Sequence, residues 1–367
     1  MSGGVDSSVA AWLLLEQGYE VIGVTMQIWQ DEEKEQQEEN GGCCGLSAVD
    51  DARRALASVT QRRTAKAAQL GIPYYVMNFK ADFKKSVIDY FTAEYLAGRT
   101  PNPCIACNRY VKWEALLKRS LEIGADYIAT GHYARVARLA NGRFAVRRCV
   151  TEAKDQTYAL YNLTQEQLSH TLMPVGDYTK EEIREFAARL KLRVADKPDS
   201  QEICFVPDQD YAGFIERTTG QPSVEGNFVT KDGVVLGRHK GIIHYTIGQR
   251  RGLGLPMGRR VVVTEIRPDT NEVVIGEQED VFTRILYADR LNYMAEPAFA
   301  AGRPAVAKIR YNHRGTPCRI YPEGENGVRV EFDEPVRAVT PGQAVVFYDG
   351  DYVLGGGTIR SSAIKVS

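Results

Sequence analysis

The sequence predicts an α/β fold, a doubly wound parallel sheet, followed by two small β domains. Two observations support this prediction. Strand-like and helix-like segments alternate along the first two hundred residues, which is typical of a parallel sheet covered by helices. After about Phe205 the pattern changes to short alternating runs with turn residues between them, at spacings suited to small β barrels.

The individual elements follow from periodicity and from glycine or proline at the segment ends. The expected helices are Ser8–Gly18, Val49–Leu70, Lys112–Gly124 and Lys180–Leu190, and the expected strands between them are Val21–Val24, Tyr74–Met77 and Tyr127–Thr130. The expected β runs of the second half are Gly233–Leu236, Arg260–Glu265, Glu272–Ile275, Ala305–Arg310, Gly327–Phe332 and Ala344–Tyr348. We place the three domains at residues 1–212, 213–284 and 285–367.

The composition is that of a soluble globular protein, with 44% hydrophobic and 25% charged residues in 367. We find no long uncharged apolar run and no basic-then-apolar leader, so we expect a cytoplasmic protein with no membrane contact. The net charge is −1, but residues 31–39 hold six acids against one lysine. The rest of the chain is therefore net basic, and basic residues gather near Arg238–Lys240, Arg250–Arg251, Arg259–Arg260 and Lys308–Arg314.

The segment Ser2-Gly3-Gly4-Val5-Asp6-Ser7-Ser8 lies directly before the first expected helix. Paired glycines let backbone N–H groups approach a phosphate, and a helix N-terminus adds partial positive charge. The serine hydroxyls can donate to phosphate oxygens, and Asp6 can hold Mg²⁺. The Gly-Lys-Ser/Thr ending of a Walker A loop is missing. A plain glycine turn with a capped helix is the alternative.

The whole SGGVDSS string resembles the signature of the PP-loop ATP pyrophosphatases. That resemblance implies cleavage of ATP to AMP and pyrophosphate, with the AMP used to activate a carbonyl oxygen as a leaving group. It implies ATP with Mg²⁺ as the cofactor and the first domain as the adenylating domain. It does not indicate the substrate.

Seven cysteines, an odd number in a long chain, favour thiol or metal chemistry over a disulfide scaffold. Two motifs contain three of them: GRTPNPCIACNRYVK at 98–112 and DKPDSQEICFVP at 196–207. Together with TGHYAR at 130–135 and KDQ at 154–156, these motifs resemble the bacterial tRNA-specific 2-thiouridylases over nearly the whole chain. That family thiolates the wobble uridine of tRNA.

The resemblance implies a role for each motif. Cys107, before Asn108, is the nucleophile, and Cys204 is the persulfide carrier that a cysteine desulfurase or relay protein must load. Arg109 is a candidate for stabilising a thiolate. The residues implied to bind ATP are Met1, Ser2, Gly3, Gly4, Val5, Asp6, Ser7, Met26 and Gly131. Those implied to contact tRNA are Asn102, Pro103, Cys104, His132, Lys154, Asp155, Gln156, Arg310, Tyr311 and Gln343, and the last β domain is implied to be a tRNA-binding barrel.

Several alternatives stay open. Cys104 forms a C-x-x-C pair with Cys107, and with Cys204 these thiols could ligate an iron–sulfur cluster with one open iron. We expect packing roles for Cys149 and Cys318, and a structural role for Cys43 and Cys44. A different AMP-forming PP-loop ligase would need neither Cys107 nor Cys204. A third alternative is a catalytically inactive RNA-binding or iron–sulfur sensor protein.

Two features depart from the family pattern. The phosphate loop normally follows an apolar strand, whereas this chain begins with the loop itself, so we expect a central strand to be missing through a misplaced start codon or a truncation. The segment ALASVTQRRT at 55–64 is extra sequence.

Overall fold

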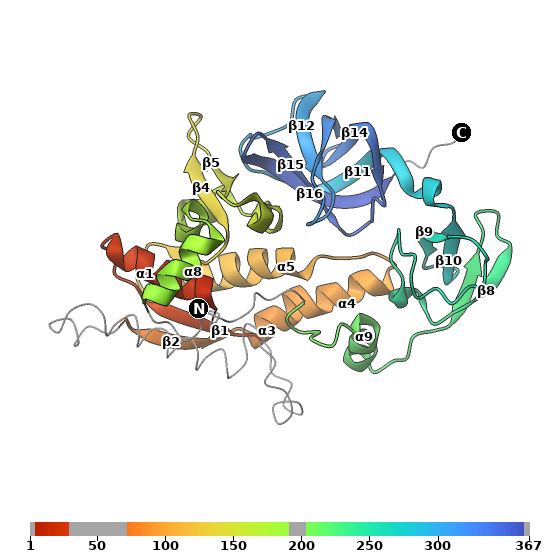
Figure 1. Ribbon diagram of the computed structural model, residues 1–367, viewed down its shortest axis with the longest axis horizontal. Helices are drawn as coiled ribbons and strands as arrows, with labels where there is room; N and C mark the ends of the chain where they lie inside the picture. The colour runs from red at the N-terminus through yellow and green to blue at the C-terminus, as the bar shows by residue number, and fades with distance from the viewer. Residues whose placement is uncertain (1–3, 29–71, 191–202, 363–367) are drawn as a thin grey trace. The chain divides into compact units, whose positions relative to one another are not determined.

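The computed structural model describes residues 4–28, 72–190 and 203–362. These residues form two compact units (Figure 1). The first unit comprises Met1–Val87 and Cys104–Gln209, and the second comprises Ile88–Pro103 and Asp210–Ser367.

The first unit alternates helices with short parallel strands. Strand β1 (Gly23–Gln27) pairs in parallel with β2 (Tyr74–Asn78), and β3 (Ile128–Ala129) pairs in parallel with β6 (Thr171–Leu172). Among the described residues of the first unit, the parallel pairing consists of these two separate pairs. The strands predicted near residues 21, 74 and 127 are therefore confirmed, with shifts of at most three residues at their ends.

Helices α1 (Val5–Glu16) and α8 (Lys180–Arg189) share an apolar core. The core side chains from these helices are Val5, Val9, Ala10, Leu13, Ile183 and Ala187. A capping box fixes the start of α8, because the Thr179 hydroxyl accepts from Glu182 N and the Glu182 carboxylate accepts from Thr179 N. The helices predicted at both places are confirmed.

The first unit contains further helices and strands. Among them are α3 (Lys80–Phe83), α5 (Pro103–Ala106), a π-helical stretch (Cys107–Leu116), α6 (Leu117–Glu122), β4 (Ala134–Arg138), β5 (Phe144–Arg148) and α7 (Gln165–Ser169). The helix predicted at Lys112–Gly124 thus begins earlier, at Pro103. The antiparallel β4–β5 hairpin was not predicted. The helix expected at Val49–Leu70, with the extra sequence at 55–64, lies outside the described residues.

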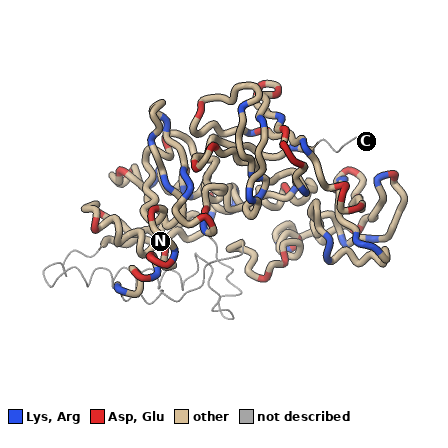
Figure 2. Tube along the Cα trace, turned by 45° about the horizontal axis from the view of Figure 1, so that its top comes forward, with Lys and Arg blue, Asp and Glu red and all other residues tan. Residues whose placement is uncertain are grey.

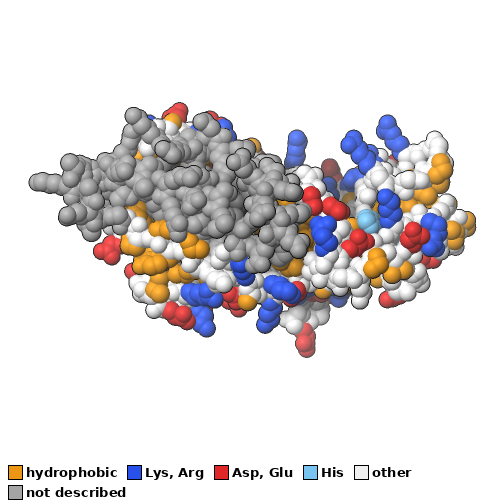
Figure 3. Space-filling view, turned by 90° about the horizontal axis from the view of Figure 1, so that it is seen from below, with side chains coloured by type: hydrophobic (Ala, Val, Ile, Leu, Met, Phe, Trp, Pro, Cys, Tyr) orange, Lys and Arg blue, Asp and Glu red, His pale blue; other side chains and the backbone are white. Residues whose placement is uncertain are grey.

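Large apolar side chains are exposed around these strand pairs. Tyr75 is 52% exposed, and Tyr19, Ile22, Val76 and Tyr127 are also exposed. Hydrophobic side chains are accordingly visible on the surface of the first unit in Figure 3. Charged residues of both signs are interspersed along both units (Figure 2).

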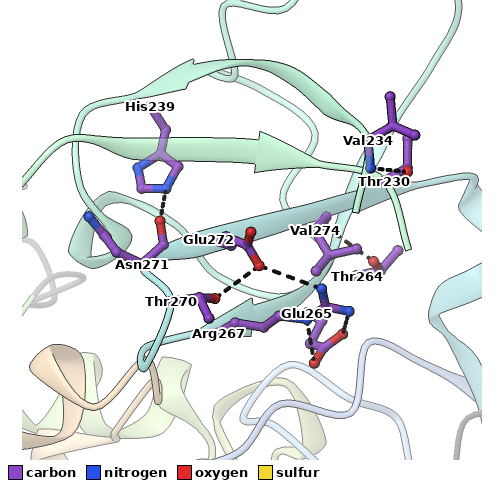
Figure 4. A network of polar contacts seen from close by, with 10 residues as sticks. All are labelled: Thr230, Val234, His239, Thr264, Glu265, Arg267, Thr270, Asn271, Glu272 and Val274. Carbon is purple, nitrogen blue, oxygen red and sulfur yellow. Dashed lines mark hydrogen bonds and ion pairs between the residues drawn. The ribbon is translucent and has the colours of Figure 1, made fainter. Parts of the chain in front are cut away.

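The second unit begins with helix α4 (Asp89–Leu96) and continues with α9 (Tyr211–Thr219). A four-stranded sheet follows, in the order β8 (Val235–His239), β7 (Gly226–Val229), β10 (Glu272–Gly276) and β9 (Val262–Arg267). Its apolar core contains Phe228, Tyr245, Val263, Val273 and Ile275. On its polar side, Arg267 lies between Glu265 and Glu272 (Figure 4).

The chain ends in a closed antiparallel β barrel. Its strands are β11 (Phe282–Tyr293), β12 (Arg303–Lys308), β13 (Thr316–Glu323), β14 (Gly327–Arg337), β15 (Ala344–Asp349) and β16 (Tyr352–Ser362). They pair in the order β11-β14-β13-β12-β15-β16, and β11 also pairs with β16, which removes free edges. The change from α/β to β segments after residue 205 is confirmed. No described helix has the length and apolar character that a membrane span requires.

The barrel core gives the first testable prediction. Phe347 of β15 is fully buried and lies edge-on to Phe299, with ring centroids 5.4 Å apart. We expect Phe347→Ala to lower the free energy of unfolding by about 3–5 kcal/mol, through lost transfer free energy and the cavity left behind. Urea denaturation measures this loss. Phe282→Ala on the more exposed Phe282 is the matched control and should cost much less; equal losses would contradict the assignment of Phe347 to the core.

Candidate active site

The described part of the phosphate loop forms the start of α1. Gly4 is the extended N-cap residue, and the hydroxyls of Ser7 and Ser8 donate to its carbonyl oxygen at 3.1 and 3.0 Å. Met1, Ser2 and Gly3 lie outside the described residues. An N-terminal helix turn with backbone N–H groups and small polar side chains suits an anion. The local geometry therefore agrees with the phosphate-binding role expected for Gly4, Val5, Asp6 and Ser7.

Asp6 is held by two groups from distant parts of the chain. Its Oδ1 accepts from the Tyr133 hydroxyl at 2.8 Å and from the Lys180 ammonium at 2.8 Å. Lys180 also lies 3.1 Å from Oδ2 and faces the Tyr133 ring at 5.3 Å from its centroid. The Lys180 side chain is only 6% exposed, whereas that of Asp6 is 30% exposed. Because a buried ammonium needs a partner, this ion pair fixes both side chains.

Gly131 lies directly against the same loop. A Cβ atom at position 131 would lie 2.7 Å from the Asp6 carbonyl carbon and 2.8 Å from Ser7 N. Only glycine allows this close approach of two backbone segments. The structure thus brings together Asp6, Ser7 and Gly131, three of the residues predicted to bind ATP. Met26 lies on β1, in register with Met77 of β2.

The segment Lys154–Gln156 is hydrogen-bonded to Tyr133, the residue that contacts Asp6. The Gln156 side-chain oxygen accepts from Tyr133 N at 2.8 Å, and Gln156 N donates to Tyr133 O at 3.0 Å. Asp155 is 7% exposed and accepts from the Thr157 hydroxyl at 2.6 Å. These two side chains of the predicted tRNA-contact segment therefore form part of the protein scaffold. Lys154 is partly exposed.

His132 follows Gly131 in the sequence and has a polar and an aromatic neighbour. Its Nδ1 is 2.8 Å from the Thr130 hydroxyl, and its ring centroid is 5.5 Å from that of Trp113. Burial, and then the positive charge of Lys112, lower the pKa of His132 well below its usual range. His132 is therefore neutral at physiological pH, so it can act as a hydrogen-bonding group and not as a cation.

Cys107 is the first residue of the π-helical stretch, and it is half-buried. The next residue anchors it: buried Asn108 donates to Ala159 O at 2.9 Å and accepts from the Lys112 ammonium at 2.9 Å. The guanidinium of Arg109, the expected thiolate-stabilising group, donates to Asn162 O at 3.0 Å. The helix that carries Cys107 is thus bound to the segment that follows Gln156.

The remaining cysteines fall into two groups. Cys104 is exposed and Cys204 is half-buried, whereas Cys149 and Cys318 are buried, as expected for packing residues. Burial raises the pKa of Cys149 and raises that of Cys318 to about 12, so neither is a ready thiolate. Among the described residues no three His, Cys, Asp or Glu side chains converge on one point, so Cys104, Cys107 and Cys204 are not arranged as a cluster site. Cys43 and Cys44 lie outside the described residues.

The loop before the cysteine helix belongs to the second unit, where it is hydrogen-bonded to the segment that precedes β15. Gln343 Nε2 donates to Thr100 O at 2.8 Å, and Thr100 N donates to Pro341 O at 2.9 Å. The Thr100 hydroxyl is 3.2 Å from that of Thr246. Gln343, predicted to contact tRNA, therefore fixes the backbone that leads into Asn102 and Pro103. Pro103 is buried and Asn102 is half-buried.

The chain matches known families along its length. Models described as tRNA methyl transferase HUP domain, tRNA methyl transferase PRC-barrel domain and aminomethyltransferase beta-barrel domain match residues 1–208, 212–277 and 283–359. A protein of Lachnoclostridium phytofermentans named tRNA-specific 2-thiouridylase MnmA is 67% identical over 98% of each chain. Its namesake in Clostridium acetobutylicum is 55% identical, also over 98% of each chain.

The chain belongs to the tRNA-specific 2-thiouridylase family. The family and the enzyme class predicted from the sequence, a tRNA sulfurtransferase, are confirmed. The predicted fold class is confirmed as well, because the three matching models describe a HUP domain and two β-barrel domains.

Sequence reasoning missed two residues of this candidate site. Tyr133 lies within the quoted TGHYAR motif, but nothing in its spacing indicated a bond to Asp6. Lys180 reads as an ordinary helix-start residue of α8. One signal could have indicated the role of Lys180. The apolar face of α8 predicts that this helix is buried against a neighbour, and a lysine at the start of a buried helix needs an acidic partner.

The Asp6–Lys180 pair gives the second prediction. Lys180→Met should lower the free energy of unfolding because it leaves the Asp6 carboxylate without its cation, and Asp6→Asn should do so by leaving the buried ammonium unpaired. The double variant should lose less than the sum of the single losses, with a coupling of about 0.5–3 kcal/mol. Thermal unfolding of the four proteins measures the coupling. Additive losses would show that the two side chains do not interact.

Proposed function

We propose that this enzyme catalyses the ATP-dependent 2-thiolation of the wobble uridine of tRNA. The relatives with identity over nearly the full chain carry a name that states the tRNA substrate and the 2-thiouridine product class. The observation in the structure that carries the proposal is the close packing of Gly131 on Asp6 and Ser7 at the N-terminus of α1. It is the kind of preformed backbone cradle that a nucleotide phosphate requires.

The first proposed step is adenylation of the base. The uridine C2 oxygen attacks the α-phosphorus of ATP, the bond to the β-phosphate oxygen breaks, and pyrophosphate leaves. The α1 N-terminus stabilises the phosphates with its N–H groups and partial positive charge. Met26 is proposed to contact the adenosine. Neutral His132 lies next to Gly131, where it can donate or accept a hydrogen bond without adding charge.

Asp6 is the residue proposed to hold Mg²⁺. It is one carboxylate, exposed enough to reach a ligand, and Mg²⁺ commonly takes one or two carboxylates together with substrate phosphate oxygens and water. The site therefore fits a Mg²⁺ that is held mainly by the nucleotide. When bound, the ion would neutralise phosphate charge. Lys180 and Tyr133 keep the carboxylate in place toward the loop.

The second proposed step transfers sulfur. The terminal sulfur of a Cys204 persulfide attacks C2, and AMP leaves with the former C2 oxygen. The Cys107 thiolate then attacks Cys204 Sγ, the persulfide S–S bond breaks, and 2-thiouridine is released. A Cys107–Cys204 disulfide remains, which a thiol reductant must reduce before a sulfur donor protein reloads Cys204.

The substrate must present an unpaired base to this chemistry. The unstacking of one base costs roughly a few kcal/mol. Asn102 and Pro103 are proposed to lie beside the target base, on the backbone that Gln343 and Thr246 hold. Exposed Tyr311 offers a stacking surface, and Arg310 a cation.

An iron–sulfur route is the second candidate, because Cys104 lies one helical turn before Cys107 on continuous helical backbone. The three cysteines as placed do not form a ligand set, so we derive no step through a cluster.

The cysteines give the third prediction. Cys107→Ser and Cys204→Ser should each abolish 2-thiouridine formation while leaving ATP binding and the melting temperature nearly unchanged. Cys104→Ser is the matched control on the same helix and should remain active under aerobic and anaerobic conditions. Mass spectrometry of nucleosides from tRNA incubated with each variant measures the product. Loss of iron and activity together in Cys104→Ser, with iron in the anaerobic wild-type protein, would instead support the cluster.

The phosphate loop gives the fourth prediction. Asp6→Ala should abolish tRNA-dependent pyrophosphate release, because the triphosphate is no longer positioned. Gly131→Ala should reduce it by at least tenfold, because the added methyl group displaces the Asp6–Ser7 backbone. Asp177→Asn removes an exposed carboxylate on the same unit and should have little effect. Normal release by Asp6→Ala would remove Asp6 from the site, and release without dependence on tRNA would favour another type of PP-loop ligase.

A further inference from the structure

Two stretches of the second unit contain basic residues and no acidic ones. Between Asp232 and Glu265 the chain has Lys and Arg at six positions and no Asp or Glu: Arg238, Lys240, Arg250, Arg251, Arg259 and Arg260. Between Glu296 and Glu323 it again has only basic charged residues, among them Lys308 and Arg310. These stretches belong to different β domains, so their convergence depends on the fold.

Hydrogen bonds connect both stretches to Arg337, which is the last residue of β14. The Arg310 guanidinium donates to Arg337 O at 3.0 Å. The Arg337 guanidinium in turn donates to Gly248 O at 2.9 Å. Gly248 has φ of 87° and is fixed to β9 by a bond from its N–H to Val263 O at 2.8 Å. Arg250 follows Gly248 two residues later, and a Cβ at position 248 would lie 3.5 Å from Arg337 Nη1, so the turn that carries Arg250 lies against the Arg337 guanidinium.

The electrostatics agree with this geometry. The pKa of Arg337 is lowered by burial first, and then by the positive charges of Arg250 and Arg310. The pKa of His313 is lowered to about 4 by burial, Arg310 and Lys308, so the imidazole adds no charge at neutral pH. Three guanidinium groups therefore share one region, and their mutual repulsion is unfavourable unless an anion binds there.

No carboxylate of the described chain forms an ion pair with Arg250, Arg310 or Arg337. Other arginines of the same unit differ in this respect. Arg267 lies between Glu265 and Glu272 (Figure 4), and Arg303 contacts Glu296 at 2.6 Å and Asp349 at 2.9 Å. The charges of Arg250, Arg310 and Arg337 are thus not neutralised by a carboxylate of the described residues, which leaves them available to an external anion.

We propose that Arg250 and Arg337, together with Arg310, form a binding site for a backbone phosphate of the tRNA. This inference rests on the proposed function and extends it to two residues and to one chemical group of the substrate. Planar guanidinium groups suit phosphate, to which they donate in pairs. The site positions the RNA and does not read its sequence, since a phosphate carries no base identity.

The test is tRNA binding, without catalysis, as a function of salt. Dissociation constants are measured by filter binding for the full-length wild type, Arg250→Gln, Arg337→Gln and the control Arg360→Gln, whose guanidinium is exposed on the barrel 3.9 Å from Glu323. Arg250 is exposed, so its variant should fold normally. We expect each of the first two variants to weaken binding about three- to tenfold at low salt. Each variant should also reduce by about one the magnitude of the slope of the logarithm of the tRNA association constant against the logarithm of the salt concentration. Arg360→Gln should do neither.

Three other outcomes would contradict, in turn, the phosphate site, its assignment to RNA and the proposed function. If the wild type binds tRNA and the slope is unchanged in both Arg250→Gln and Arg337→Gln, the phosphate site is wrong. If these variants lose binding of inorganic phosphate but keep tRNA binding unchanged, the site serves a free anion and the RNA assignment is wrong. If the wild type itself fails to bind tRNA, the proposed function fails before the site is tested.

Discussion

The candidate active site in the first unit depends on the buried contact between Lys180 and Asp6. A lysine ammonium that is almost fully excluded from water is tolerated only next to a negative charge. Here that charge belongs to the first turn of α1, so the start of α8 and the start of α1 must meet. Tyr133 joins the same carboxylate oxygen and brings the backbone of residues 131–133 against the loop. One carboxylate thereby fixes three segments that are far apart in the sequence.

From this contact a chain of hydrogen bonds leads to the cysteine helix. Tyr133 exchanges two hydrogen bonds with Gln156. In the helical turn after Gln156, the Ala159 carbonyl oxygen accepts a hydrogen bond from the Asn108 side chain. Asn108 is adjacent to Cys107. The proposed phosphate loop and the proposed nucleophile are thus linked by one hydrogen-bonded polar network within the first unit.

The sequence predicted the fold class and the family well, because both depend on local signals. The SGGVDSS loop, the periodicity of α8 and the alternation of the barrel strands are each contained in a short window. Prediction failed where geometry joins distant residues. The contacts of Lys180 and Tyr133 with Asp6, and the hydrogen bond from Gln343 to Thr100 O, could not be seen in any window. The β4–β5 hairpin was missed because residues 134–148 are rich in arginine and do not alternate cleanly.

The contacts between residues 341–343 and the backbone around Thr100 limit which domains of related enzymes can be combined in a chimera. Pro341, Gly342 and Gln343 approach the backbone of residues 99–101 so closely that a Cβ on Gly342 would lie 3.0 Å from Thr100 N. Gly342 also has φ of 89°, which disfavours any other residue. The barrel is therefore not an independent module. A chimera that takes its barrel from a relative must inherit the segment before the cysteine helix as well, and the two stretches are expected to change together as such enzymes diverge.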